Sequence, residues 1–121
     1  MDGSEKALYD IACLPREGYF CENTVIHIGR VRPITNVCPV NRSAELINIT
    51  VDYVPCDWVI ELVSYRDRLK QGFSDTLENI AEEVFIEIWG LIKPENLVVT
   101  VYLEDEYLSD WHVRLEKGSC P

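Results

Sequence analysis

The chain has 121 residues, of which 47% are hydrophobic and 26% charged, and its formal net charge is −10. This length and composition are typical of a single globular domain. The acidic balance argues against general nucleic-acid binding and against docking to anionic membranes, because both need clustered lysine and arginine. No apolar stretch approaches the roughly 18 residues that span a membrane. No signal-peptide pattern opens the sequence, so we expect a cytoplasmic protein.

The first part of the chain divides into an arm and a strand-rich region. Residues 1–22 lack a clear period and are predicted to form an N-terminal arm with a short helix near 6–12. Residues 23–121 are predicted to form one domain. Its first strand is expected over 24–31, followed by a loop that includes Pro33 and 36–42. Residues 46–54 alternate apolar and polar side chains, which predicts a half-buried strand ending at Pro55.

Two helices and two strands are predicted in the rest of the chain. The first helix is expected over 61–71 and is broken at Gly72. The second, over 75–92, has apolar residues at spacings of three and four, and Asp75 with Glu78 resembles a capping box at its start. Alternating residues predict strands over 97–103 and 109–116. This order predicts an α+β domain, with an antiparallel sheet and two helices on one of its faces.

The cysteine and histidine pattern does not indicate a metal site. The chain has five cysteines, no Cys-x-x-Cys pair, and only two histidines, His27 and His112. Structural zinc sites need four closely spaced ligands of these types, so no metal is expected. Both histidines lie in predicted strands and are interpreted as ordinary strand residues.

A cysteine and three carboxylates form the candidate site. Cys38 precedes a strand, Glu45 begins it, and Glu61 and Glu78 each open a helical segment. A thiolate nucleophile needs a neighbouring acid or base, and a polar substrate needs an anchor. Each residue also has an ordinary structural explanation. Cys38 could be a buried structural cysteine and Glu45 a solvated strand residue, while helix dipoles favour glutamate at helix starts.

Four short segments of the chain contain these residues or lie between them. They read Cys38-Pro39-Val40-Asn41-Arg42-Ser43-Ala44-Glu45, Asp52-Tyr53-Val54-Pro55, Glu61-Leu62-Val63-Ser64 and Leu77-Glu78-Asn79. In order and approximate spacing they resemble the patterns C-P-x-T-x-Q-P-D, D-Y-x-P, E-L-K-S and His-Glu-Asn of a known family, the 7-cyano-7-deazaguanine reductases (QueF) of the tunnelling-fold superfamily.

The resemblance implies a fold, an assembly and a set of roles. Family members close their sheets into barrels by forming ring-shaped homo-oligomers, often pentamers stacked into decamers, with sites between subunits. Cys38 would attack the nitrile carbon of 7-cyano-7-deazaguanine to form a covalent thioimide, with Glu45 as the acid. Glu78 would recognise the base, and Glu61 and Ser64 would assist in binding it.

The resemblance implies NADPH-dependent reduction to the aminomethyl base of queuosine synthesis, and we take this as the first interpretation. Arg66, with Arg68 and Lys70, would then contact a cofactor phosphate; the alternative is that these three residues form an ordinary solvated helix face. Val63 replaces a lysine of the family's cofactor motif, and Leu77 replaces its histidine. A rival interpretation is therefore a related amidinotransferase, which acts on tRNA in archaeosine synthesis. A third is a non-catalytic protein that binds a purine or pterin ring through Glu78. Outside the tRNA interpretation we expect no nucleic-acid partner.

Overall fold

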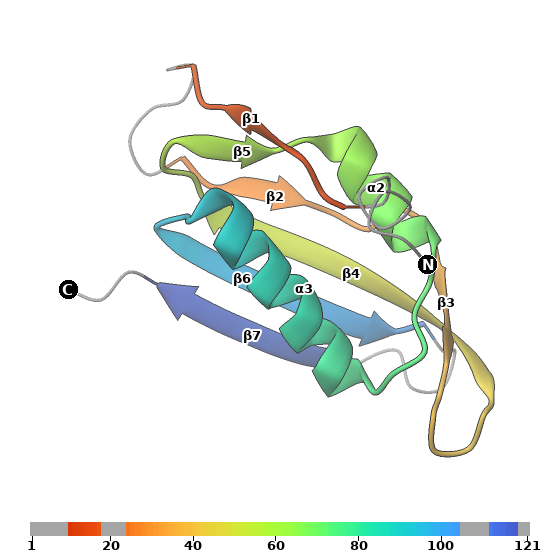
Figure 1. Ribbon diagram of the computed structural model, residues 1–121. Coiled ribbons are helices and arrows are strands. Elements are labelled where there is room, and N and C mark those ends of the chain that lie inside the picture. Colours follow the sequence, from red (N-terminus) through yellow and green to blue (C-terminus); the bar gives the residue numbers. More distant parts are fainter. Residues whose placement is uncertain (1–9, 18–23, 105–111, 119–121) are drawn as a thin grey trace.

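The computed structural model describes residues 10–17, 24–104 and 112–118 (Figure 1). In chain order, the elements of this part are β1 (Cys13–Pro15), β2 (Ile26–Ile28), β3 (Ile34–Val37), β4 (Ala44–Val54), β5 (Trp58–Ile60), α2 (Leu62–Lys70), α3 (Leu77–Ile92), β6 (Asn96–Leu103) and β7 (His112–Gly118). No helix in these residues is both long enough and apolar enough to cross a membrane.

The long strand β4 organises the main sheet. One edge of β4 pairs with β6, which in turn pairs with β7, and the other edge carries β2 and β3 one after the other. All of these pairings are antiparallel, and β1 and β5 form a separate antiparallel pair. Both helices lie over the same face of the main sheet (Figure 1). The predicted α+β architecture is therefore confirmed.

The short strands differ from the prediction. A single strand was expected over 24–31, whereas β2 spans only Ile26–Ile28 and β3, at Ile34–Val37, lies where a loop was predicted. The 11 residues of β4 provide an edge long enough for both short strands. β1 lies within the predicted arm, and β1 and β5 have three residues each, too few for a period to be recognised.

The ends of the chain overlap the described residues only in part. The expected helix near 6–12 is described from residue 10 onward, and residues 10–12 are not helical. Residues 109–111 of the last predicted strand lie outside the described part, and β7 continues beyond the predicted end to Gly118.

Helix α3 begins one residue later than the proposed capping box implies. Thr76 is its N-cap, and its Oγ1 accepts a hydrogen bond from the Asn79 amide at 3.3 Å. The Asp75 carboxylate instead accepts from the Thr76 amide at 2.8 Å and from the Asn79 side chain at 3.0 Å. Glu78 remains in the first turn of the helix.

Gly72 brings the segment before α3 against β3. Its φ is +77°, and a Cβ atom there would lie 2.7 Å from the Thr35 carbonyl oxygen, so only glycine fits. That carbonyl accepts a hydrogen bond from the Phe73 amide at 3.0 Å, and the Phe73 carbonyl accepts one from the Val37 amide at 3.1 Å. The start of α3 is thereby held beside the end of β3.

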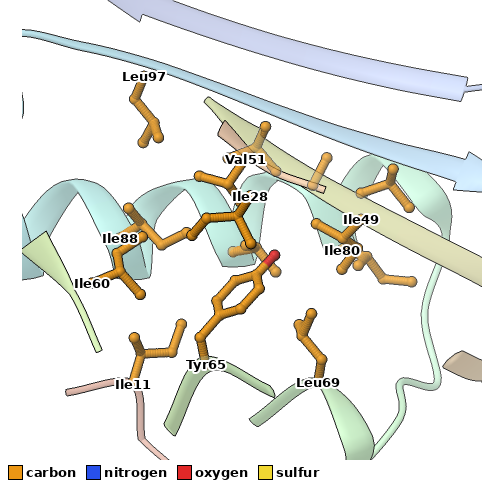
Figure 2. Close-up of a cluster of buried hydrophobic side chains, with 14 of the residues drawn as sticks. Ile11, Ile28, Ile49, Val51, Ile60, Tyr65, Leu69, Ile80, Ile88 and Leu97 are labelled. Atoms are coloured by element: carbon orange, nitrogen blue, oxygen red, sulfur yellow. The ribbon is translucent and has the colours of Figure 1, made fainter. Parts of the chain in front are cut away.

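The core lies between the helices and the sheet. The apolar face predicted for β4 is correct, because Ile47, Ile49, Val51 and Tyr53 are at most 2% exposed. The strand is not half-buried as predicted, since the polar Asn48 and Thr50 of its other face are also buried. Tyr65 projects from α2 into the aliphatic side chains of this core (Figure 2). Burial raises the pKa of Tyr65 and also that of Tyr53 above the usual range. The Tyr53 hydroxyl accepts a hydrogen bond from the Ile60 amide at 3.0 Å, whereas within the described residues the Tyr65 hydroxyl has no partner.

The two tyrosines predict opposite responses to the loss of a hydroxyl group. Tyr53→Phe leaves the buried Ile60 amide unpaired and is expected to lower the free energy of unfolding by about 1–3 kcal/mol. Tyr65→Phe removes a hydroxyl that has no partner and is expected to leave stability unchanged or raised. Urea denaturation at pH 7 measures both effects. Equal losses in the two variants would contradict this assignment.

The same pair predicts how stability changes in alkaline solution. A tyrosine with a raised folded-state pKa contributes stability that is complete below its unfolded pKa of about 10 and is lost as the pH rises further. The wild type should therefore lose stability above pH about 10. Tyr65→Phe should lose less than the wild type over that range.

Candidate functional site

Cys38 lies in the turn of the hairpin that joins β3 to β4. The Cys38 amide donates to the Ser43 carbonyl at 3.0 Å, and the Cys38 carbonyl accepts from the Arg42 amide at 2.7 Å. Asn41 adds a side-chain bond to the Ser43 amide at 3.0 Å. Arg42 adopts a left-handed conformation with φ of 59°. These bonds close the turn and hold the half-buried thiol at the end of the hairpin.

Glu45 is tied to a residue that the sequence interpretation did not include, Asn36. The two residues face each other across the hairpin, and Asn36 Nδ2 donates to Glu45 Oε1 at 2.7 Å. Asn36 is fully buried and also bonds the backbone of Asp75, donating to its carbonyl at 2.9 Å and accepting from its amide at 3.1 Å. One side chain therefore connects the strand that carries Glu45 to the segment that starts α3.

Glu78 lies beside this junction, in the first turn of α3. Its side chain is exposed, and within the described residues no hydrogen bond or ion pair engages its carboxylate. The hairpin and the start of α3 occupy the same end of the sheet (Figure 1). The fold therefore brings the elements that carry Cys38, Glu45 and Glu78 to one end of the molecule.

Glu61 and Ser64 are engaged elsewhere, at the start of α2. The two Glu61 carboxylate oxygens accept from the amides of Val63 at 2.9 Å and Ser64 at 2.6 Å. The Ser64 hydroxyl donates to the Glu61 carbonyl and accepts from the Ala12 amide, each at 2.8 Å. These contacts cap the helix and bind the β1 segment to it. Helix α2 is about 13 Å long and approaches β3 at its other end, so the chain separates this pair from the hairpin.

The cap also changes the titration of Glu61. The Ser64 amide, followed by the Val63 amide, holds the pKa of the Glu61 carboxyl below its usual range. A lowered folded-state pKa means that the stabilising contribution is present at neutral pH and is lost as the pH falls through that pKa. The role predicted for Glu61 and Ser64 in substrate binding stays a prediction.

Arg66 lies at a cationic cavity beside β3. The cavity has a volume of about 340 Å³ and is lined by Val31, Arg32, Pro33, Ile34, Thr35, Arg66, Leu69 and Lys70. Three of these residues are cations in a chain of net charge −10, and Arg66 also contacts Asp67 at 3.3 Å. Arg68 points away from this group, because its guanidinium pairs with Glu83 at 2.8 Å and Glu87 at 3.5 Å on α3. The cavity is suited to an anionic group.

The other cysteines of the described residues lie away from the Cys38 hairpin. Burial, followed by the charges of Glu95 and Asp57, raises the pKa of the Cys56 thiol. Cys13 is half-buried, whereas Cys21 and Cys120 lie outside the described residues.

His27 has an acidic partner that sequence spacing did not reveal. Its Nδ1 lies 2.5 Å from Asp52 Oδ1, on the neighbouring strand. The two residues are 25 positions apart in the chain and are brought together only by the pairing of β2 with β4. Within residues 10–17, 24–104 and 112–118, no group of three or more His, Cys, Asp or Glu side chains could hold a metal ion.

The arrangement of the helices and strands defines the fold class of this chain. The chain is an α+β protein with the tunnelling fold, which the comparison with solved structures supports. It is similar to the archaeosine synthase QueF-Like, solved in its apo form, with a TM-score of 0.68 and 17% sequence identity over 80% of this chain and 96% of that one. No family model and no curated protein matches the sequence.

Proposed function

We propose that this protein is an enzyme that attacks the nitrile carbon of 7-cyano-7-deazaguanine with the Cys38 thiol. The observation that carries the proposal is the junction at the end of the sheet, where hydrogen bonds connect the Cys38 hairpin and Glu45 to the start of α3. These bonds put the elements that carry the proposed nucleophile, acid and anchor in contact with one another. The similarity to an archaeosine synthase and the patterns around Cys38, Glu45 and Glu78 support it.

The first chemical step is addition across the nitrile. The Cys38 S–H proton passes to the Glu45 carboxylate, the sulfur forms a bond to the nitrile carbon, one π bond of the C≡N group breaks, and the nitrogen takes a proton. Glu45 delivers that proton in the proposal. One of its oxygens, Oε1, is already held by Asn36, so Oε2 is the oxygen available to the substrate. The product is a thioimide that still contains every atom of the base.

Glu78 supplies the specificity for the base. A carboxylate accepts two parallel N–H bonds, which matches the ring N–H and the exocyclic amine of a guanine-like edge. Its position in the first turn of α3 adds the helix dipole, which keeps a negative charge favourable there.

For the fate of the thioimide we propose amidine formation. Ammonia would attack the thioimide carbon and expel the Cys38 thiolate, with no change in oxidation state. The archaeosine synthase neighbour supports this outcome. So does Val63, an exposed apolar residue at the position where the reductases have a lysine. The substrate would then be the base within tRNA.

A second candidate, reduction, is supported by the cationic cavity. Arg32, Arg66 and Lys70 line a space in which a cofactor phosphate would find three positive charges. The net charge of −10 also favours a small free base over RNA. Reduction of a nitrile to an amine needs two hydrides and two protons, so this route consumes two NADPH for each base.

Assembly into a ring is part of the proposal. Within the described residues β7 pairs only with β6, which leaves its other edge open to a strand from another copy. Family members of this kind form their sites between subunits. Glu61 and Ser64, which lie away from the hairpin in one chain, would then face the Cys38 of a neighbouring copy.

One experiment tests the function and separates its two outcomes. The purified chain is mixed with the cyano base, free or within tRNA, and intact mass should show a covalent adduct equal to protein plus substrate. Ammonium is then added to one sample and NADPH to another. Release of an amidine in the ammonium sample, with no loss of absorbance at 340 nm in the NADPH sample, supports the amidinotransferase. Steady NADPH oxidation supports the reductase. Absence of any adduct with either substrate rejects the proposal.

A further inference from the structure

We propose that Asn36 is the positioning residue of this site, and that it acts by holding Glu45 at a fixed place relative to the start of α3. The inference rests on the proposed function, since it assigns Asn36 a role through the proposed acid. It identifies a residue that none of the four sequence patterns contains.

The hydrogen bonds of Asn36 use both of its donors. A primary amide offers two N–H donors and one oxygen acceptor. Nδ2 donates to Glu45 Oε1 at 2.7 Å and to the Asp75 carbonyl at 2.9 Å, while Oδ1 accepts from the Asp75 amide at 3.1 Å. The reverse orientation would place Oδ1 against two acceptors, the Glu45 carboxylate and the Asp75 carbonyl. The chemistry of the partners therefore fixes the orientation of the amide.

The place of Asn36 in the core makes this connection rigid. Asn36 is 0% exposed, and its side chain lies on the same face of β3 as the buried Ile34. Water cannot substitute for its partners at such a site, so breaking one bond leaves a buried polar atom unpaired. An apolar residue would satisfy packing at this position. The Asn36 amide instead supplies hydrogen bonds to the Glu45 carboxylate on one side and to the Asp75 backbone on the other.

Glu45 needs this restraint for a specific reason. A glutamate side chain has one more rotatable bond than the aspartate of the C-P-x-T-x-Q-P-D pattern, so its carboxylate covers a wider range of positions. The bond from Asn36 to Oε1 selects one of them and leaves Oε2 to the substrate. Proton transfer requires the donor within hydrogen-bond reach of the reacting nitrogen, so the restraint acts directly on the rate of that step.

The connection continues to the proposed anchor. The backbone amide and carbonyl of Asp75 both hydrogen-bond to the Asn36 side chain. The Asp75 carboxylate accepts hydrogen bonds from the Thr76 amide and the Asn79 side chain at the start of α3. Glu78 stands in that same turn. The proposed acid and the proposed anchor are thus parts of one hydrogen-bonded network with Asn36 at its centre.

A double-variant experiment distinguishes positioning from a merely structural role. Asn36→Ala should slow thioimide formation at saturating base by about 10- to 100-fold, because general acids contribute roughly 10²- to 10⁴-fold. Affinity for the base should change less than about 3-fold. Asn36→Asp should also slow the step, because it keeps the shape and the acceptor but replaces both donors with a charge that repels Glu45. It provides the test if the alanine variant does not fold.

The decisive comparison is made in a chain that already lacks the acid. In the Glu45→Ala background, Asn36→Ala should change the rate by less than about 3-fold, since no carboxylate remains to be positioned. Tyr53→Phe is the control for lost stability, because it leaves the Ile60 amide unpaired at the other end of β4 without touching Glu45. It should lower the melting temperature and leave the rate unchanged. If Asn36→Ala slows the reaction as much in the Glu45→Ala background as in the wild type, the positioning role is overturned while the proposed function stands. A wild-type chain that forms no thioimide overturns the proposed function together with it.

Discussion

Replacing Cys38 with alanine is expected to abolish the covalent adduct with the cyano base. The thiol is the only group of the proposed site that can form the S–C bond, so its removal leaves no route to the thioimide. Intact mass after incubation with excess base should show only unmodified Cys38→Ala protein. Far-ultraviolet circular dichroism and the melting temperature should match those of the wild type, because the turn is closed by backbone bonds that alanine retains.

The other half-buried thiols provide matched controls. Cys13→Ala and Cys56→Ala should form the adduct at the wild-type rate, since neither residue lies on the hairpin. Burial raises the pKa of Cys56, which leaves it less thiolate at neutral pH and makes it a poor nucleophile. An adduct that persists in Cys38→Ala would remove the catalytic interpretation of this turn. Peptide mapping of that adduct would then identify the reactive cysteine.

The sequence was a good guide to the long elements of the fold. β4 has 11 residues and α3 has 16, so the periods of two and 3.6 repeat several times in each and their type is unambiguous. β1, β2 and β5 have three residues each, and their existence depends on partners elsewhere in the chain. Short strands of this kind are determined by tertiary contacts, which local patterns do not encode.

The candidate site was predictable only as far as its motifs extend. Cys38, Glu45 and Glu78 stand in segments that resemble known patterns, whereas Asn36 stands in none. Its contacts join residues that are 9 and 39 positions apart, and the longer one, to Asp75, forms because Gly72 lets the segment before α3 approach β3. Recognition of β3 would have given one signal, because alternation places Asn36 on the inner face with Ile34. A polar residue at an inward position indicates a specific partner.

Glu61 and Ser64 differ from Asn36, because they stand in a recognised pattern and yet lie away from the Cys38 hairpin. The segment matches part of a cofactor-associated pattern, and the structure gives its polar groups a full set of local bonds at the start of α2. The Glu61 carboxylate satisfies two of the open amides at the helix start, and the helix dipole favours its charge there, so its position is explained without a ligand. A motif at a helix terminus therefore needs independent evidence before a ligand role is assigned to it.

Glu78→Gln is expected to weaken binding of the cyano base by about 5- to 150-fold. Once the base covers the carboxylate, the substitution replaces one acceptor with a donor and leaves a substrate N–H without a partner. A buried mismatch of this kind costs about 1–3 kcal/mol, which corresponds to that range of affinity. Isothermal titration calorimetry with Cys38→Ala protein measures the non-covalent step by itself, so adduct formation does not distort the result.

Glu82→Gln is the matched control for Glu78→Gln. Glu82 is also exposed on α3, one turn further along, and the substitution removes the same charge from the same helix. It should leave the affinity for the base unchanged. The Glu78 charge also interacts favourably with the helix dipole, and losing that interaction should cost at most about 1 kcal/mol of stability. An unchanged affinity together with a lowered melting temperature would show that Glu78 serves the helix and that another group recognises the base.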